Sequence, residues 1–193
     1  MNDPILTFLA QRENLPLALE IHRHVKRLSK TIHRTFWELI KVELEKRLLD
    51  TSQSQHWELV DHATKGYDKQ DARLSLQPKA SNGLFLAPTL EQGAPEEFCL
   101  YYGIKWSEAQ KKLPPNMSQT LTLAETLEKH RFQRNSWWIG MNDLPWCIQK
   151  DEFLLAMANE QASLIAEIGE DFWSLFIKYE KLVIAANEEL AGG

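Results

Sequence analysis

The sequence predicts an α+β fold in which a central antiparallel sheet of about four or five strands packs against a long N-terminal helix and a long C-terminal helix. Apolar residues recur at three- and four-residue steps near both ends of the 193-residue chain, whereas residues 51–150 contain runs that alternate with a period of two. Short connections between these runs favour antiparallel pairing, because parallel strands need long crossovers. We therefore expect one domain, with helical residues 1–50, mainly sheet residues 51–150 and a C-terminal helix over 151–190.

The N-terminal part is expected to form two helices. Asp3 before Pro4 is a helix-start signal and predicts a short helix over about 4–12. A second helix should run from about 17 to 49, and its apolar stripe changes sides near the middle. We expect this helix to pack at both ends, its first half through the stripe from Ile21 to Leu39 and its second half through Trp37, Ile40, Leu44 and Leu48.

The middle of the chain predicts strands over 56–60, 72–77, 83–87, 98–106 and 136–141, with a helix over about 123–134. The clearest strand is 98–106. Its two faces separate Phe98, Leu100, Tyr102, Ile104 and Trp106 from Cys99, Tyr101, Gly103 and Lys105. The C-terminal helix begins at about Asp151, and Gly169 is a possible interruption.

The composition is that of a soluble globular protein, with 44% hydrophobic and 25% charged residues. No apolar run approaches the ~20 residues that span a bilayer, and the first residues lack the pattern of a signal peptide. We expect a cytoplasmic protein that does not contact a membrane. Cys99 and Cys147 have no CxxC spacing, so we expect reduced, buried thiols.

The net charge of −5 is unevenly distributed. Residues 1–50 carry nine Lys or Arg against seven Asp or Glu, whereas residues 151–193 carry two against nine. On the predicted long helix, one side gathers cations opposite the apolar stripe, and we call this set the basic face: Arg23, Lys26, Arg27, Lys30 and Arg34.

Three interpretations of the basic face stay open. It is a solvated surface, or it is covered by the acidic C-terminal helix, or it binds DNA or RNA by replacing counterions on phosphates. Membrane-surface binding is disfavoured, because the opposite side of the helix is needed for the fold.

Motifs for other chemistry are missing from the sequence. His22, His24 and His33 are not spaced to hold one metal ion on a helix, and there is no HExxH or zinc-finger spacing. Neither GxxxxGK[ST], GxGxxG nor GxSxG occurs. We expect no metal, no cofactor and no catalytic residue that the sequence can identify.

The aromatic residues of the strands have two interpretations. They fill the core between sheet and helices, which we favour, or some form a stacking platform for unpaired bases. Tyr101 and Trp138 are the expected exposed members, because they alternate away from the most apolar strand faces.

The run HRTFWELIKVELEKRL, followed by HWELVDH, ARLSLQP, GLFLAP and FCLYYGIKW, resembles the C-terminal accessory region of uncharacterised PD-(D/E)XK nuclease superfamily proteins. The resemblance covers residues 17–145 and implies a role in bacterial defence against foreign DNA. The nuclease motif needs Pro-Asp followed by an acid-x-Lys, because two carboxylates hold Mg²⁺ and the lysine orients water. This chain has no Pro-Asp pair and no acid followed two positions later by lysine, so no catalytic residue is carried over.

The sequence therefore predicts a non-catalytic interaction module that binds nucleic acid, or docks on a nucleic-acid-processing partner, through the basic face. One alternative is a structural or regulatory protein that acts through protein contacts, with the C-terminal helix as a homodimer seam. Another is an enzyme of unrecognised type, which would need a polar pocket containing Glu58, Asp61 or His62 beside the aromatic strands.

Overall fold

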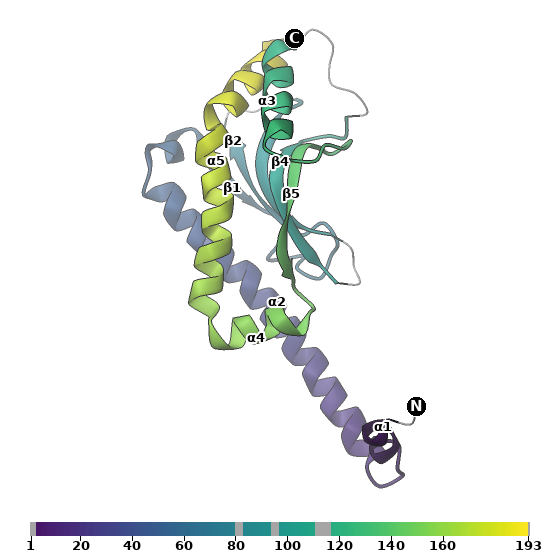
Figure 1. Ribbon diagram of the computed structural model, residues 1–193. Helices are drawn as coiled ribbons and strands as arrows, with labels where there is room; N and C mark the ends of the chain where they lie inside the picture. Colours follow the sequence, from purple (N-terminus) through teal and green to yellow (C-terminus); the bar gives the residue numbers. More distant parts are fainter. Residues whose placement is uncertain (1–2, 80–82, 94–96, 111–116, 193) are drawn as a thin grey trace.

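The centre of the protein is a five-stranded antiparallel sheet. A computed structural model describes residues 3–79, 83–93, 97–110 and 117–192. The strands follow the chain order across the sheet (Figure 1), which confirms the predicted α+β class: β1 (Trp57–Asp61), β2 (Arg73–Pro78), β3 (Leu86–Gln92), β4 (Cys99–Trp106) and β5 (Trp138–Cys147).

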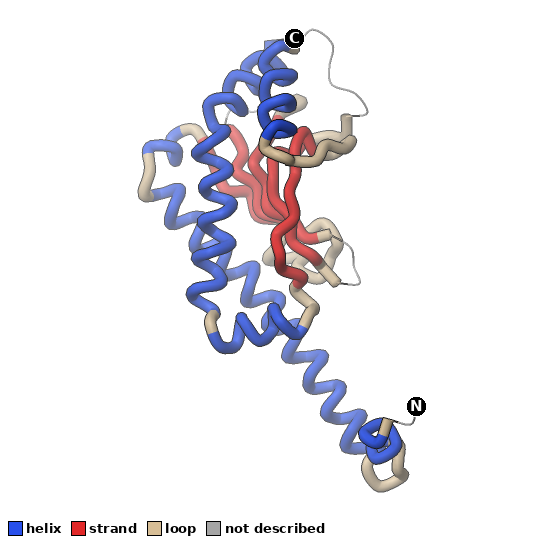
Figure 2. The backbone as a smooth tube through the Cα atoms, viewed as in Figure 1, coloured by secondary structure: helices blue, strands red, loops and turns tan. Residues whose placement is uncertain are grey.

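Helices occupy the two ends of the chain and the segment before β5. They are α1 (Pro4–Leu9), α2 (Leu15–Leu49), α3 (Ser118–Lys129), α4 (Asp151–Asn159) and α5 (Gln161–Gly192), with a 3-10 turn at Ser52–Gln55. Figures 1 and 2 show α5 running along the sheet with the second half of α2 beside it. No helix of the described residues is long and apolar enough to cross a membrane.

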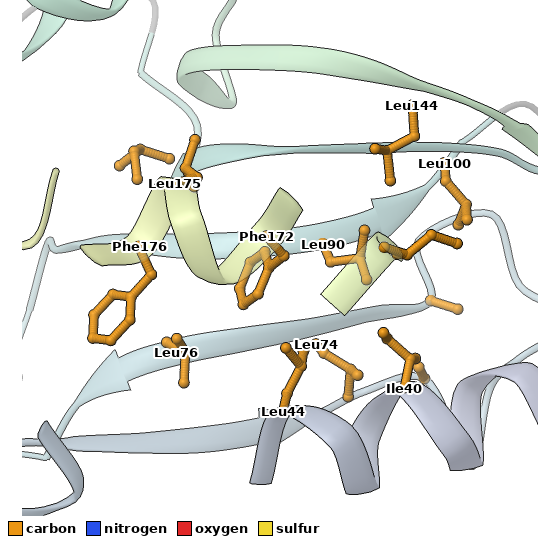
Figure 3. Packing of buried hydrophobic residues seen from close by; sticks show 14 of the residues in the cluster. Ile40, Leu44, Leu74, Leu76, Leu90, Leu100, Leu144, Phe172, Leu175 and Phe176 are labelled. Carbon is orange, nitrogen blue, oxygen red and sulfur yellow. The ribbon is translucent and has the colours of Figure 1, made fainter. Parts of the chain in front are cut away.

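The core lies between the helices and one face of the sheet. Alternate strand residues point toward the helices, as a period of two requires. Figure 3 shows this layer, to which α2 contributes Ile40 and Leu44, the strands Leu74, Leu76, Leu90, Leu100 and Leu144, and α5 Phe172, Leu175 and Phe176. The aromatic residues Tyr102 and Trp106 also belong to this core, as the pattern of β4 predicted.

Only the second half of α2 packs against the body. Trp37, Ile40, Leu44 and Leu48 are buried as predicted, and His33 is the first buried residue of the helix. The first half projects away from the body, with α1 at its tip (Figure 1). The prediction that the helix packs at both ends was therefore wrong, because an apolar stripe shows which side of a helix avoids water and not what covers that side.

Helix α3 begins five residues earlier than the sequence indicates. The carboxylate of Glu189, near the end of α5, accepts hydrogen bonds from the backbone N–H groups of Gln119 and Thr120 at 3.1 and 3.0 Å. These N–H groups have no partner within the helix, and an anion also suits a helix N-terminus. A cap supplied by a residue about 70 positions away leaves no local signal in the sequence.

The C-terminal helical region breaks at Glu160, between α4 and α5, and not at Gly169. Gly169 lies inside α5 at the crossing with α2. A methyl group added there would lie 3.0 Å from Cγ of Glu43 and 3.6 Å from Cδ1 of Ile40. The glycine is needed for close approach of two helices, not for a bend.

Strand β3 is longer than predicted and contains Pro88. The pairing with β2 runs from Arg73–Glu91 to Ser75–Thr89, so Pro88 lies one residue beyond it. A proline is tolerated where a strand has a hydrogen-bonded neighbour on only one side. The predicted strand 83–87 begins three residues before β3 and ends five residues before it does.

The two cysteines form a disulfide, so the expectation of reduced thiols was wrong. The antiparallel register places Cys99 of β4 opposite Cys147 of β5, and their sulfurs are bonded. Neither side chain is fully buried. The pair is 48 residues apart in sequence, so only the strand register reveals it.

Candidate functional site

The first candidate surface is the projecting N-terminal segment, which we call the arm and define as residues 3–34. It carries six Lys or Arg against three Asp or Glu, so its net charge is +3 in a chain of net charge −5. Apart from His33 at its base, none of its residues is buried. The arm is therefore a cationic helix exposed to solvent on nearly all sides.

All five side chains of the basic face are exposed. Among the described residues, the ion pairs of this face are limited to Arg34 with Glu38, at 3.7 Å and with both side chains more than half exposed. An exposed pair of this kind contributes little. Arg23 donates from Nε to the carbonyl oxygen of Leu19 at 3.2 Å, which leaves its guanidinium charge uncompensated.

The acidic C-terminal helix does not cover the basic face. It meets α2 farther along, where Arg47 pairs with Glu43 and with Glu170 of α5. The two ends of the chain thus pack together through the second half of α2 alone. Four of the five cations keep no carboxylate partner among the residues that the structure describes.

The apolar side of the arm is exposed as well. Ile21, Val25 and Leu28 keep 52%, 56% and 58% of their surface, although they were expected in the core. Ile5, Leu6 and Phe8 of α1 and Leu15, Leu17 and Leu19 of α2 are also exposed, and of the last three only Leu17 lies on the side of Ile21. Exposed apolar area of this extent is unusual for a monomer surface, so this side of the arm is a candidate site of interaction.

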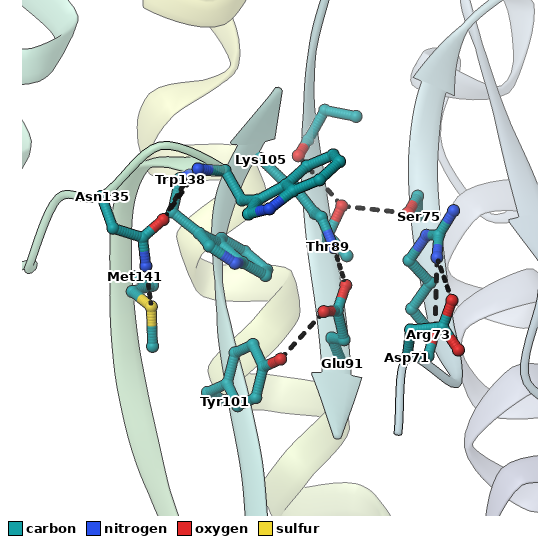
Figure 4. A network of polar contacts seen from close by, with 12 residues as sticks. Asp71, Arg73, Ser75, Thr89, Glu91, Tyr101, Lys105, Asn135, Trp138 and Met141 are labelled. Carbon is teal, nitrogen blue, oxygen red and sulfur yellow. Dashed lines mark hydrogen bonds and ion pairs between the residues drawn. The ribbon is translucent and has the colours of Figure 1, made fainter. Parts of the chain in front are cut away.

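The second candidate surface is the sheet face turned away from α2 and α5, which is hollowed into a pocket of about 870 Å³. Its floor comes from alternate residues of β2, β3 and β4, and its wall from the segment that enters β5. Figure 4 shows the polar side chains that meet there: Arg73, Ser75, Thr89, Glu91, Tyr101, Lys105 and Asn135, beside Trp138 and Met141.

Glu91 is the centre of this polar network. Its side chain is buried, accepts a hydrogen bond from Oη of Tyr101 at 2.8 Å and forms an ion pair with Nζ of Lys105. Burial lowers the pKa of Lys105, and Glu91 acts in the opposite direction. Burial and the neighbouring Glu91 raise the pKa of Tyr101, so its phenol is protonated at neutral pH.

The charges of the pocket compensate one another. Glu91 neutralises Lys105, and Arg73 lies 3.6 Å from Asp71. Within the described part of the chain, the network leaves neither a general base nor a nucleophile without a partner. Its paired cations are also less free to bind an anionic ligand than the cations of the arm. One signal for this network was visible in the sequence, because Tyr101 and Lys105 alternate on the less apolar face of β4. Glu91 was missed, because the predicted strand ended before it.

Tyr101 and Trp138, predicted as exposed stacking residues, lie side by side in this pocket with ring centroids 5.4 Å apart. Trp138 is only 3% exposed, so its predicted exposure was wrong. It pairs with Lys105 in the sheet and faces the pocket floor. The exposed ring is its neighbour Trp137, at 49%, which lies just before the strand begins.

Glu58, Asp61 and His62 do not line the pocket. They lie on and after β1, at the edge of the sheet. Burial acts to raise the pKa of Asp61, but hydrogen bonds from Thr64 and Ala63 and the contact with Lys41 outweigh it and lower that pKa. Asp61 thus fixes the turn after β1, and the three residues lie apart from the pocket beside the aromatic strands.

One group of metal-ligand residue types occurs among the described residues, at Glu97, Cys99 and Cys147. The two sulfurs are bonded to each other. Since thiolates are the sulfur ligands of metals, the group offers a single carboxylate while the disulfide is intact. His22, His24 and His33 do not converge, since His33 is buried against Gln92.

No family model, no curated protein and no solved structure matches this chain. The resemblance to an accessory region of PD-(D/E)XK proteins therefore stays a prediction.

Proposed function

We propose that the protein is a non-catalytic interaction module that binds nucleic acid through the basic face of its arm. The observation that carries the proposal is the set of five exposed cations on a helix that leaves the body, and four of these cations have no carboxylate partner among residues 3–79, 83–93, 97–110 and 117–192. From Arg23 to Arg34 the face extends over roughly 16 Å. A row of cations of this length can meet several phosphates of one strand and release their counterions.

The pocket is a weaker candidate for a polyanion. Its two cations, Arg73 and Lys105, are each paired with a carboxylate, so a phosphate would compete with an existing partner. The buried Glu91 would also repel it. Charge thus favours the arm over the sheet face as the surface for nucleic acid.

A cytoplasmic location, which the sequence predicts, suits a nucleic-acid partner. The cross-strand disulfide argues in the other direction, because disulfides persist mainly in oxidising compartments. The predicted association with a nuclease system is a further part of this proposal. The same proposal has a second form, in which the basic face of the arm contacts a nucleic-acid-processing protein and not the nucleic acid itself.

Fluorescence anisotropy of a labelled 20-base-pair DNA duplex tests the proposal. Lys26→Glu, Arg27→Glu and Lys30→Glu, introduced together, should abolish measurable binding at 100 mM salt. The matched control is Lys65→Glu, Lys129→Glu and Lys181→Glu, which makes the same charge change at exposed lysines of the body. Binding that survives the first triple substitution, or that the control weakens equally, would contradict the proposal.

Vesicles of anionic lipid provide the contrasting outcome. If Val25→Glu with Leu28→Glu removes vesicle binding while DNA binding is undetectable, the arm is a membrane-surface helix and the proposal fails.

A further inference from the structure

Apolar residues on one side of α2, three of them exposed and Ile32 half-buried at the edge of the core, follow the spacing of a coiled-coil seam. Ile21, Val25, Leu28 and Ile32 are separated by steps of four, three and four residues, which is the alternation of the a and d positions of a heptad. We infer that this row, the seam, packs against the same row of a second copy of the chain. The seam lies opposite the basic face, so this inference does not depend on nucleic-acid binding.

The residue types of the seam fit two strands. Val25 and Ile32 occupy one set of heptad positions, and both are β-branched. Leu28 and Ile21 occupy the other set, in which Leu28 is the residue type that two strands favour and Ile21 is not. β-Branched residues at a with leucine at d favour parallel two-stranded coiled coils. We therefore expect a parallel, in-register dimer, in which each seam residue meets its own counterpart.

The neighbours of the seam allow two copies to approach. The flanking positions hold His22, His24, Ser29 and Thr31, and none of these is a lysine or an arginine. All the cations of the basic face fall on the outer side of the helix, away from a partner at the seam. Two arms of net charge +3 can then associate without placing like charges against each other across the interface.

The body of the protein leaves room for the partner arm. α2 packs on the body through His33, Phe36 and Ile40, and this side lies roughly 100° around the helix from the seam. A twofold axis along the seam places the two bodies on opposite sides of the paired arms. The dimer then carries two outward basic faces, so it would bind one nucleic-acid segment for each copy.

Both the exposed apolar area of the arm and the stability of its helix favour packing of the seam against a partner. Ile21, Val25 and Leu28 of the seam and Leu17 beside them are 52–59% exposed, whereas Leu15 and Leu19 lie on other sides of the helix. At roughly 60 Å² each, the four side chains present about 240 Å² per copy and about 500 Å² over two copies, which is the apolar share of a specific interface of ~1,000 Å². An uncovered helix of this length is also marginal in water, because most helical stability comes from packing of the apolar face.

Sedimentation equilibrium of the full chain between 5 and 200 µM tests the inference. The expected mass rises to twice 22.4 kDa over this range. Val25→Glu with Leu28→Glu should hold the chain at the monomer mass. The control pair Lys26→Glu with Arg27→Glu changes the outer side of the same turns and should leave the dimer intact. Far- and near-UV circular dichroism establishes that the body of each variant is folded.

Cysteine cross-linking tests whether the two arms of the dimer are parallel. Ile21→Cys and Leu28→Cys, made separately, should each form an intermolecular disulfide in high yield, because each position meets itself in a parallel pair. A wild-type chain that stays monomeric at 200 µM, or a dimer that survives the two glutamates in the seam, would overturn the inference. Cross-linking at one of the two positions alone would overturn the parallel arrangement.

Discussion

Gln92 is the residue whose replacement tests most sharply how the arm is fixed to the body. Its side-chain amide donates to the carbonyl oxygens of Tyr67 at 2.7 Å and Lys69 at 2.6 Å. Its Oε1 accepts from Nε1 of Trp37 at 3.0 Å and lies 2.7 Å from Nε2 of His33. Because both amide hydrogens are used, Oε1 is the acceptor and His33 carries its proton on Nε2.

Gln92→Leu removes this acceptor from two buried donors. Trp37 is fully buried and His33 nearly so, and the substituted side chain offers neither a partner. Each buried N–H left without an acceptor costs about 1–3 kcal/mol. The two carbonyl oxygens lie at a more exposed loop and can turn to water. We expect the free energy of unfolding to fall by ~2–6 kcal/mol.

Urea denaturation followed by tryptophan fluorescence measures this loss. The dependence on urea should keep its slope, because the surface exposed on unfolding is unchanged. Gln149→Leu is the matched control at an exposed glutamine, for which we expect a change within about 0.5 kcal/mol. A loss below 1 kcal/mol for Gln92→Leu would refute the view that this network anchors the start of the packed part of α2.

Two further predictions concern pH and redox state. Burial lowers the pKa of His33 below its ordinary value of 6.5, although Gln92 and Asp68 oppose the shift. The unfolded chain then binds the extra proton first, so the free energy of unfolding should be full above the unfolded pKa and fall as the pH drops below it. Proton NMR titration of the His33 ring checks it, and a midpoint at or above 6.5 would contradict it. Reducing the disulfide between Cys99 and Cys147, which are 48 residues apart in sequence, should lower the free energy of unfolding by about 2–4 kcal/mol. Thiol titration of the denatured chain should find free thiols only after the reductant is added, and their presence before it would refute the bond.

Local periodicity was sufficient for the elements whose neighbours are also close in sequence. The alternation in residues 98–106 predicted both the strand and its core face, and Trp37, Ile40, Leu44 and Leu48 predicted the packed side of α2. Consecutive antiparallel strands need only short links, so the sheet class followed from the pattern.

The failures come from contacts between distant residues. Glu189 caps α3, and the strand register brings Cys99 to Cys147. Neither has a local signature. The arm is a different case. Ile21 and Leu28 belong to a clear helical stripe, but the sequence does not show whether that stripe packs on the same molecule or on another one. Among the pocket residues, Tyr101 was identified from the sequence as a candidate site residue. Glu91 was not, because it lies beyond the end of the predicted strand 83–87.

The salt dependence of DNA binding tests the central claim, that the basic face of the arm is the surface for nucleic acid. For five phosphate contacts the logarithm of the binding constant should fall against the logarithm of salt concentration with a slope of about −4.5, and the triple glutamate variant should show a slope near −2 wherever its binding can be measured. A wild-type slope near zero, or equal slopes for the two proteins, would contradict the claim.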